Sequence, residues 1–318
     1  MVDRDRLFQR ACNYFALWEL TGRRPQVTAN LWSRITSITD VNEPLPLELG
    51  TMIDIPDWTP ARIRNVQKQV ERAMKEVLRR GSDHILEKGT PQYPRLLGQI
   101  DGAPEFLFAR GNLELLDRPA LAVVGTRNAS EEGLRRASKL ACLLVNHGIV
   151  VVSGLARGID TAAHRGALSV GTETIAVIGT PLGITYPPEN ADLQKQIEKV
   201  GLVVTQFYPG AGIRRHYFPM RNAVMSGLCL GTVIVEASEH SGALIQARQC
   251  LKQGRKLFIP KSAVENPGLR WPKEYLKKGA CEFSTIEELM GILRNEHLLP
   301  PENKPVCAES LRRIKMVL

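Results

Sequence analysis

The chain has 318 residues, of which 43% are hydrophobic and 24% are charged, as is ordinary for a globular protein with a full core. Lysine and arginine number 42 against 33 acidic residues, and the net charge of +9 favours a polyanionic partner, either nucleic acid or an anionic membrane. No stretch approaches the roughly 18 apolar residues of a spanning helix, and the charged N-terminus MVDRDRLFQR excludes a signal peptide. We therefore expect a cytoplasmic protein with no membrane partner.

Several enzyme and metal classes are excluded by absent motifs. The six cysteines include no C-x-x-C pair and no histidine at zinc spacing, which indicates free thiols in a reducing compartment. HExxH, GxxxxGK[ST] and GxGxxG are also missing, which argues against a metalloprotease and a P-loop ATPase. We expect no bound metal and no cofactor.

Residues 1–82 have apolar positions at helical spacing and no strand pattern, with a Pro/Gly-marked connection over 41–58. The segment 61–80 carries seven basic residues against two acidic ones. Such a helix can line a nucleic-acid channel, but it is more often a solvated face.

From Pro119 the pattern changes to short apolar runs that alternate with amphipathic segments. One such segment follows Ser130, with Leu134, Ala137, Leu140, Ala141, Leu144 and Val145 on one face. The preceding stretch 83–118 is expected to pack against the sheet as a link. The runs that predict buried parallel strands are 120–125, 148–154, 173–179, 201–207, 231–237 and 255–260.

Six β-α units of this kind predict an α/β fold, a doubly wound, mostly parallel Rossmann-like sheet preceded by a helical N-terminal domain. We expect a helical domain over 1–82, a Rossmann-like domain over 83–296 and a C-terminal tail over 297–318.

Small and charged residues gather where the predicted strands end, which is where open parallel sheets bind ligands. Glycines, hydroxyls and helix N-termini there predict a floor of exposed N–H groups, with arginine charge, for a phosphate. At any single one of these turns, the glycine would be explained by the need for a tight turn, without a ligand. The predicted anion-binding residues are Gly125, Thr126, Arg127, Ser153, Gly154, Arg157, Ser241 and Gly242.

A second cluster lies over 209–222, a predicted loop in which arginines interleave with aromatic residues. Arginine contacts phosphates in bidentate fashion, and aromatic rings stack on unpaired bases. Alternatively, Phe218 belongs to the core and Arg221 and Asn222 cap the next helix. The candidate DNA-binding residues are Arg214, Arg215, Phe218, Arg221 and Asn222.

Asp160 and His164 stand four residues apart and could suggest a metal or acid–base pair. We instead expect Asp160 to brace the glycine-rich turn or cap its helix, because no further ligands accompany His164. Glu236 is likewise expected to brace a loop. No residue is predicted to be catalytic.

Motifs in one fixed order give the chain a family resemblance over about residues 83–285. They are YPRLL, PEFLFARGN, VGTRNAS, SGLARGIDTAAHRGAL, YPPEN, FPMRN, VEASEHSGALIQA, GRKLF and KKGA. The chain resembles the DNA-processing protein A (DprA/Smf) family in its Rossmann-like domain. This resemblance implies single-stranded DNA binding and protection without catalysis, loading of a RecA-type recombinase in natural transformation (competence) or recombination, and a homodimer formed through that domain.

The chain also departs from the family pattern, as a divergent member would. Thr205-Gln206 replaces Ser-Glu at the end of the fourth strand, and Ala223 stands where a second arginine is common. Two alternatives remain open: a pocket for a nucleotide-derived small molecule, which it binds or hydrolyses, and a scaffold in a defence or recombination complex that docks through residues 1–82.

Overall fold

A computed structural model describes residues 2–299, with the side chains of 2–3 and 76–80 outside that description. The described residues contain one sheet, ordered β1-β2-β6-β5-β4-β3-β7-β8-β9. Its strands are β1 Asp83–Glu87, β2 Phe106–Gly111, β3 Ala120–Val124, β4 Val150–Ser153, β5 Thr174–Val177, β6 Leu202–Thr205, β7 Gly231–Ile234, β8 Lys256–Pro260 and β9 Cys281–Phe283.

All six predicted parallel strands are present, so the doubly wound fold is confirmed. β3 is central, with β4, β5 and β6 on one side and β7 and β8 on the other. The strand order reverses between β3 and β7. The carboxyl ends of strands at such a switch point form a crevice, which is the expected ligand site.

The expectation of a simple link over 83–118 was wrong, because this stretch adds two antiparallel strands to the β6 edge of the sheet. In β2, Phe106 and Phe108 enter one core while Leu107 and Ala109 enter the other. Both faces are apolar, which hides the period-2 alternation that marks a half-buried strand.

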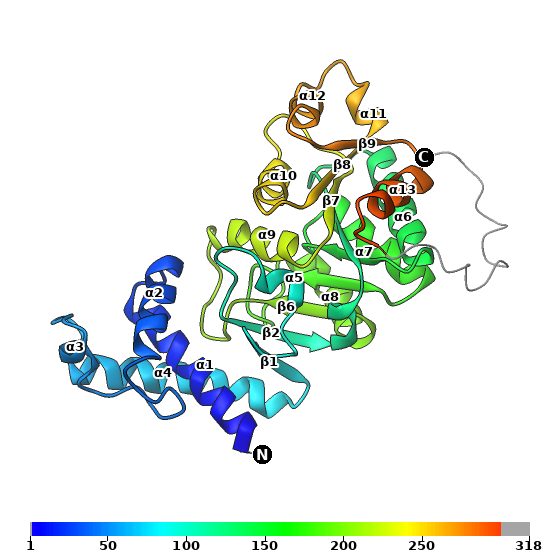
Figure 1. Ribbon diagram of the computed structural model, residues 1–318. Helices are drawn as coiled ribbons and strands as arrows, with labels where there is room; N and C mark the ends of the chain where they lie inside the picture. The colour runs from blue at the N-terminus through cyan, green and yellow to red at the C-terminus, as the bar shows by residue number, and fades with distance from the viewer. Residues whose placement is uncertain (1, 300–318) are drawn as a thin grey trace.

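The sheet is covered on both faces (Figure 1). Leu121 and Val123 of β3 share a core with α6, α7 and α13, while Ala120 and Ala122 face the core that contains α9 and α10. The helices that follow β1 are α5 Arg95–Gly98, α6 Glu131–Asn146, α7 Ile159–Val170, α8 Ala191–Val200, α9 Tyr217–Gly227, α10 Ala243–Lys252, α11 Lys261–Val264, α12 Trp271–Leu276 and α13 Ile286–Asn295, with 3-10 turns at η1 Leu113–Asp117 and η2 Pro188–Asn190.

Helix α6 buries five of the six residues predicted for its apolar face. The exception is Leu134, which is 36% exposed. Leu134 stands in the first turn of the helix, where the neighbouring Gly133 is buried and Leu134 itself lies at the margin of the buried face.

Four helices precede the sheet and lie beyond its β1 edge (Figure 1). Aromatic side chains join them to the sheet: Phe15 of α1 lies 5.5 Å from Phe108 and 4.9 Å from Tyr208, between ring centroids. A cavity of about 700 Å³ lies at this junction. These helices are α1 Val2–Leu20, α2 Pro25–Ile35, α3 Leu49–Met52 and α4 Pro60–Arg80.

The division into three domains stays a prediction. Of the predicted tail, residues 300–318 lie outside the described residues. Across residues 2–299, no helix combines the length and apolarity needed to span a bilayer.

Candidate functional site

Two hollows lie side by side at the carboxyl ends of the strands. The larger, which we call the strand-end pocket, has a volume of about 490 Å³ and is lined by residues that follow β3 and by the starts of α9 and α10. The smaller, the tyrosine pocket, has about 220 Å³ and is lined by the loops that follow β4 and β5. The residues that line both are Arg127, Ala156, Phe218 and Arg221. An extended ligand can therefore reach from one hollow into the other.

Ten of the thirteen predicted site residues line these pockets, which brings together segments more than 100 positions apart in the chain. They are Gly125, Thr126, Arg127, Gly154, Arg157, Phe218, Arg221, Asn222, Ser241 and Gly242.

Three predicted residues do not line either pocket. Ser153 is fully buried, and its hydroxyl donates to the Val123 carbonyl at 2.7 Å. Arg214 and Arg215 are exposed in the loop before α9.

The predicted loop over 209–222 was too long, because α9 begins at Tyr217 and includes Phe218, Arg221 and Asn222. Pro219 lies in the first turn of this helix. In the first turn of a helix, a backbone N–H needs no partner within the helix, so proline is tolerated there.

Arg221 forms the charged floor of both pockets. It is 6% exposed, and its Nη1 donates to the Val177 carbonyl at 2.6 Å. Burial lowers the pKa of its guanidinium, although the nearby Asp160 carboxylate opposes that shift. The site therefore holds a positive charge with little water around it, where electrostatic attraction for an anion is strong.

Asp160 braces the glycine-rich turn after β4, as expected. Its Oδ2 accepts from the backbone N–H groups of Gly154 at 3.1 Å and Ala156 at 3.4 Å. Burial raises the pKa of this carboxyl, while Arg221 and these two donors act against that rise. The expectation that this turn exposes its N–H groups to a ligand was wrong at these two positions, because the carboxylate already holds them.

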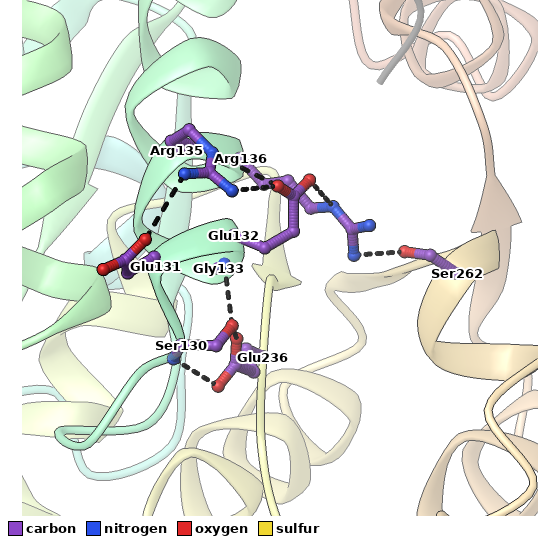
Figure 2. A network of polar contacts seen from close by, with 8 residues as sticks. All are labelled: Ser130, Glu131, Glu132, Gly133, Arg135, Arg136, Glu236 and Ser262. Atoms are coloured by element: carbon purple, nitrogen blue, oxygen red, sulfur yellow. Dashed lines mark hydrogen bonds and ion pairs between the residues drawn. The ribbon is translucent and has the colours of Figure 1, made fainter.

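The N-terminus of α6 is occupied by acidic side chains of the chain itself (Figure 2). Glu236 accepts from the Ser130 N–H at 3.0 Å and from its hydroxyl at 2.6 Å, and the Ser130 Oγ accepts from the Gly133 N–H. This confirms the bracing role of Glu236.

In contrast, α9 and α10 start at the strand-end pocket, and their cap residues make no side-chain cap bond. Their first N–H groups are nevertheless engaged: Tyr217 and Phe218 donate to backbone carbonyls of the preceding turn. In α10, Ala243 donates to the Ser241 hydroxyl oxygen and Leu244 donates to the Ser241 carbonyl. The expectation that these helix starts expose N–H groups was wrong, so only the helix dipoles favour an anion there.

Sequence reasoning missed Tyr186 as a site residue. It follows β5, is 41% exposed, and its ring lies 5.3 Å from that of Phe218, between centroids. The two rings form an aromatic wall of the tyrosine pocket beside Arg127. The available signal was a tyrosine before two prolines in the segment that follows a predicted strand.

His164 is fully buried, and its Nδ1 lies 2.7 Å from the Thr174 hydroxyl. That hydroxyl donates to the Val151 carbonyl, so Nδ1 carries the hydrogen and donates to Thr174. Burial and Arg221 lower the pKa of His164 from 6.5 to about 3, which keeps the ring neutral. The described residues hold no cluster of three or more histidine, cysteine or acidic side chains that could bind a metal.

Sequence comparison places this site within a family. The model described as DNA recombination-mediator protein A matches residues 84–294. DNA processing protein DprA of Streptococcus pneumoniae is 45% identical over 174 residues, which cover 54% of this chain and 61% of that protein. Protein Smf of Escherichia coli is 36% identical over 230 residues, which cover 71% of this chain and 62% of that protein. The chain thus matches about three fifths of the length of these curated relatives.

Solved structures agree. The X-ray structure of DNA processing protein A from Streptococcus pneumoniae superimposes with a TM-score of 0.72 at 32% identity, covering 88% of this chain and 97% of that one. The protein of the same name from Helicobacter pylori, described for its single-stranded DNA binding mode, gives a TM-score of 0.60 at 26% identity and covers 67% and 96%.

Proposed function

Because this chain belongs to the DNA recombination-mediator protein A family, we propose that it holds single-stranded DNA at the carboxyl edge of its sheet and does not cut it. The observation that carries the proposal is the Tyr186–Phe218 aromatic pair beside Arg127 and above the buried Arg221. The rings supply stacking surfaces for unpaired bases, and the arginines attract phosphate.

The strand-end pocket supports a phosphate contact on the same path. The starts of α9 and α10 line it together with Arg127, so partial and full positive charges meet there. Arg214 and Arg215, exposed before α9, offer further phosphate contacts outside the pockets. A strand that runs over several phosphates fits this distribution of charge better than one isolated nucleotide does.

The absence of cutting is also a proposal. Acidic groups at and near the site are engaged in the fold: Asp160 accepts from two backbone N–H groups, and Glu236 accepts from Ser130. Glu189, which lines the tyrosine pocket, is paired with Arg157. None of these three carboxylates is placed to activate water or bind a metal for hydrolysis. We further propose a cytoplasmic homodimer that delivers DNA to a RecA-type recombinase, on the strength of the family relationship.

Fluorescence anisotropy with a labelled poly-dT series and a matching duplex, at two salt concentrations and with mononucleotides as competitors, tests the DNA proposal. Affinity that rises with strand length, falls with salt and favours the single strand supports it, because each phosphate contact releases counterions. Binding of a mononucleotide with no length dependence would overturn it in favour of a small-molecule pocket.

A further inference from the structure

The N-terminal helices hold the base of the arginine-containing loop that precedes α9. Three side chains form the contact: Glu19 and Arg23 at the end of α1, and Tyr208 after β6. Tyr208 donates its hydroxyl to Glu19 Oε1 at 2.6 Å, and Arg23 Nε donates to Glu19 Oε2 at 2.8 Å. Arg23 Nη1 then donates to the Ala211 carbonyl at 3.1 Å. We call this group the Glu19 clamp.

The clamp is largely shielded from water. The Glu19 and Arg23 side chains are 14% and 16% exposed, and Tyr208 is 1% exposed. Burial and the hydrogen bond to Glu19 raise the pKa of the Tyr208 hydroxyl, so it stays protonated and remains a donor. Charge-assisted hydrogen bonds in such surroundings are stronger than the same contacts in water.

Arg23 occupies a backbone conformation that suits its role. The end of α1 is closed by bonds from the Gly22 N–H to the Glu19 carbonyl and from the Arg23 N–H to the Trp18 carbonyl, the pattern of a Schellman motif. Gly22 has a φ of 68°, and Arg23 follows with a φ of 65°. A left-handed conformation is unfavourable for a residue with a Cβ. It turns the arginine side chain toward residues 208–211.

The loop beyond the clamp is fixed at both ends and open between them. Ala211 is buried at one end, and Tyr217 is buried at the other, where its ring stacks on Phe207 at 3.9 Å. Between them, Ile213 is 49% exposed, and Arg214 and Arg215 are exposed. The position of these two arginines therefore depends on where the ends of the loop are held.

We propose that Glu19 and Arg23 are positioning residues: through Tyr208 and Ala211 they hold the Arg214–Arg215 loop in the form that receives the DNA strand. Residues 1–24 then contribute to DNA affinity without touching DNA. The effect on the loop stands alone, whereas the effect on affinity rests on the proposed function.

Limited proteolysis of the full chain tests the effect on the loop, because trypsin cuts after arginine and its rate follows the population of the open form. Arg23→Asn removes the guanidinium and keeps a residue that tolerates positive φ. Tyr208→Phe removes only the hydroxyl and keeps the ring against Phe15. We expect each variant to raise cleavage after Arg214 and Arg215 about tenfold, as loss of one charge-assisted bond does to a local opening equilibrium. New chain ends are identified by mass spectrometry.

Arg24→Asn is the matched control. Arg24 is exposed and adjacent to Arg23, so this substitution removes the same charge next to the clamp without removing a clamp contact. Its cleavage pattern should match that of the unaltered chain. Unchanged cleavage in both clamp variants, with thermal unfolding showing that they are folded, would overturn the proposal.

Anisotropy with poly-dT on the same variants separates the two proposals. Faster cleavage together with DNA affinity reduced about tenfold supports both the effect of the clamp on the loop and the effect of the loop on DNA affinity. Faster cleavage with unchanged affinity would overturn the step from the loop to DNA while leaving the clamp itself in place. Absence of DNA binding in the unaltered chain would instead refute the proposed function.

Discussion

The Arg221 guanidinium lies beside Gly154, in the space that a side chain at position 154 would fill. The two residues come from α9 and from the turn after β4, so the glycine is required by a tertiary contact and not by a left-handed backbone. This contact lets a charged group reach the floor of both pockets while its Nη1 remains bonded to the Val177 carbonyl.

Gly154→Ala should therefore displace Arg221. Overpacking of this kind destabilises a protein by about 1–3 kcal/mol, and we expect a lower melting temperature together with weaker DNA binding. Gly242→Ala is the control for the melting temperature alone, because Gly242 lines the strand-end pocket but, apart from its two chain neighbours, no heavy atom of the described residues lies within 4 Å of the position of its Cβ. Equal melting temperatures for the two variants would show that Arg221 moves aside without a loss of stability, and would contradict the prediction.

His164 should make the fold sensitive to acid. Its pKa is lowered from 6.5 to about 3 in the folded chain, so the unfolded chain takes up the proton first as pH falls. The stability from the neutral ring is fully present above pH 6.5 and is lost as pH falls toward 3, by at most about 1.4 kcal/mol per pH unit.

His164→Asn keeps a donor toward Thr174 and removes the titrating group, so its stability should fall less steeply over this range. Denaturant unfolding at several pH values measures the difference between the two proteins. Comparing them at each pH removes the contribution of Asp160, whose raised pKa acts in the opposite sense. Parallel pH profiles would mean that another group controls the acid response.

Much of the fold could be predicted because parallel strands are buried on both faces and therefore appear as short β-branched runs. All six such runs were confirmed as strands. The strands β1 and β2 were missed for a related reason: β1 is a short edge strand with mixed burial, and β2 lacks alternation because both of its faces are apolar.

The site could be located in part because strand ends at a switch point follow from topology. How deeply a side chain at such a strand end is buried does not follow from topology. Arg221 and Arg214 have the same chemistry in sequence, yet one is buried under Gly154 and the other is exposed. The pairing of Tyr186 with Phe218 depends on a contact between segments 32 positions apart, which no local pattern encodes.

Tyr186→Ala should weaken single-stranded DNA binding by about 1–3 kcal/mol, the contribution of one base stacked on an aromatic ring. Tyr186→Phe keeps the ring and should bind as the unaltered chain does. Duplex binding should change little in either variant, because paired bases are already stacked. An equal loss for the single strand and the duplex would assign Tyr186 to loop structure instead of stacking.

Arg127 and Arg157 should differ in how they contribute to the salt dependence of binding. Both line the tyrosine pocket, but Arg157 Nε lies 3.3 Å from Glu189 Oε1, whereas Arg127 has no acidic partner within 4.0 Å among the described residues. Each phosphate contact on a single strand contributes about 0.7 to the slope of log K against log salt. Arg127→Gln should remove about that much, and Arg157→Gln should remove less, because Glu189 already neutralises part of its charge. The measurement is a salt titration of poly-dT affinity for the two variants side by side.

A larger change of slope for Arg157→Gln would contradict this prediction. The DNA strand would then have to displace Glu189 from Arg157, and its path would run through the tyrosine pocket toward η2 and not along the start of α10.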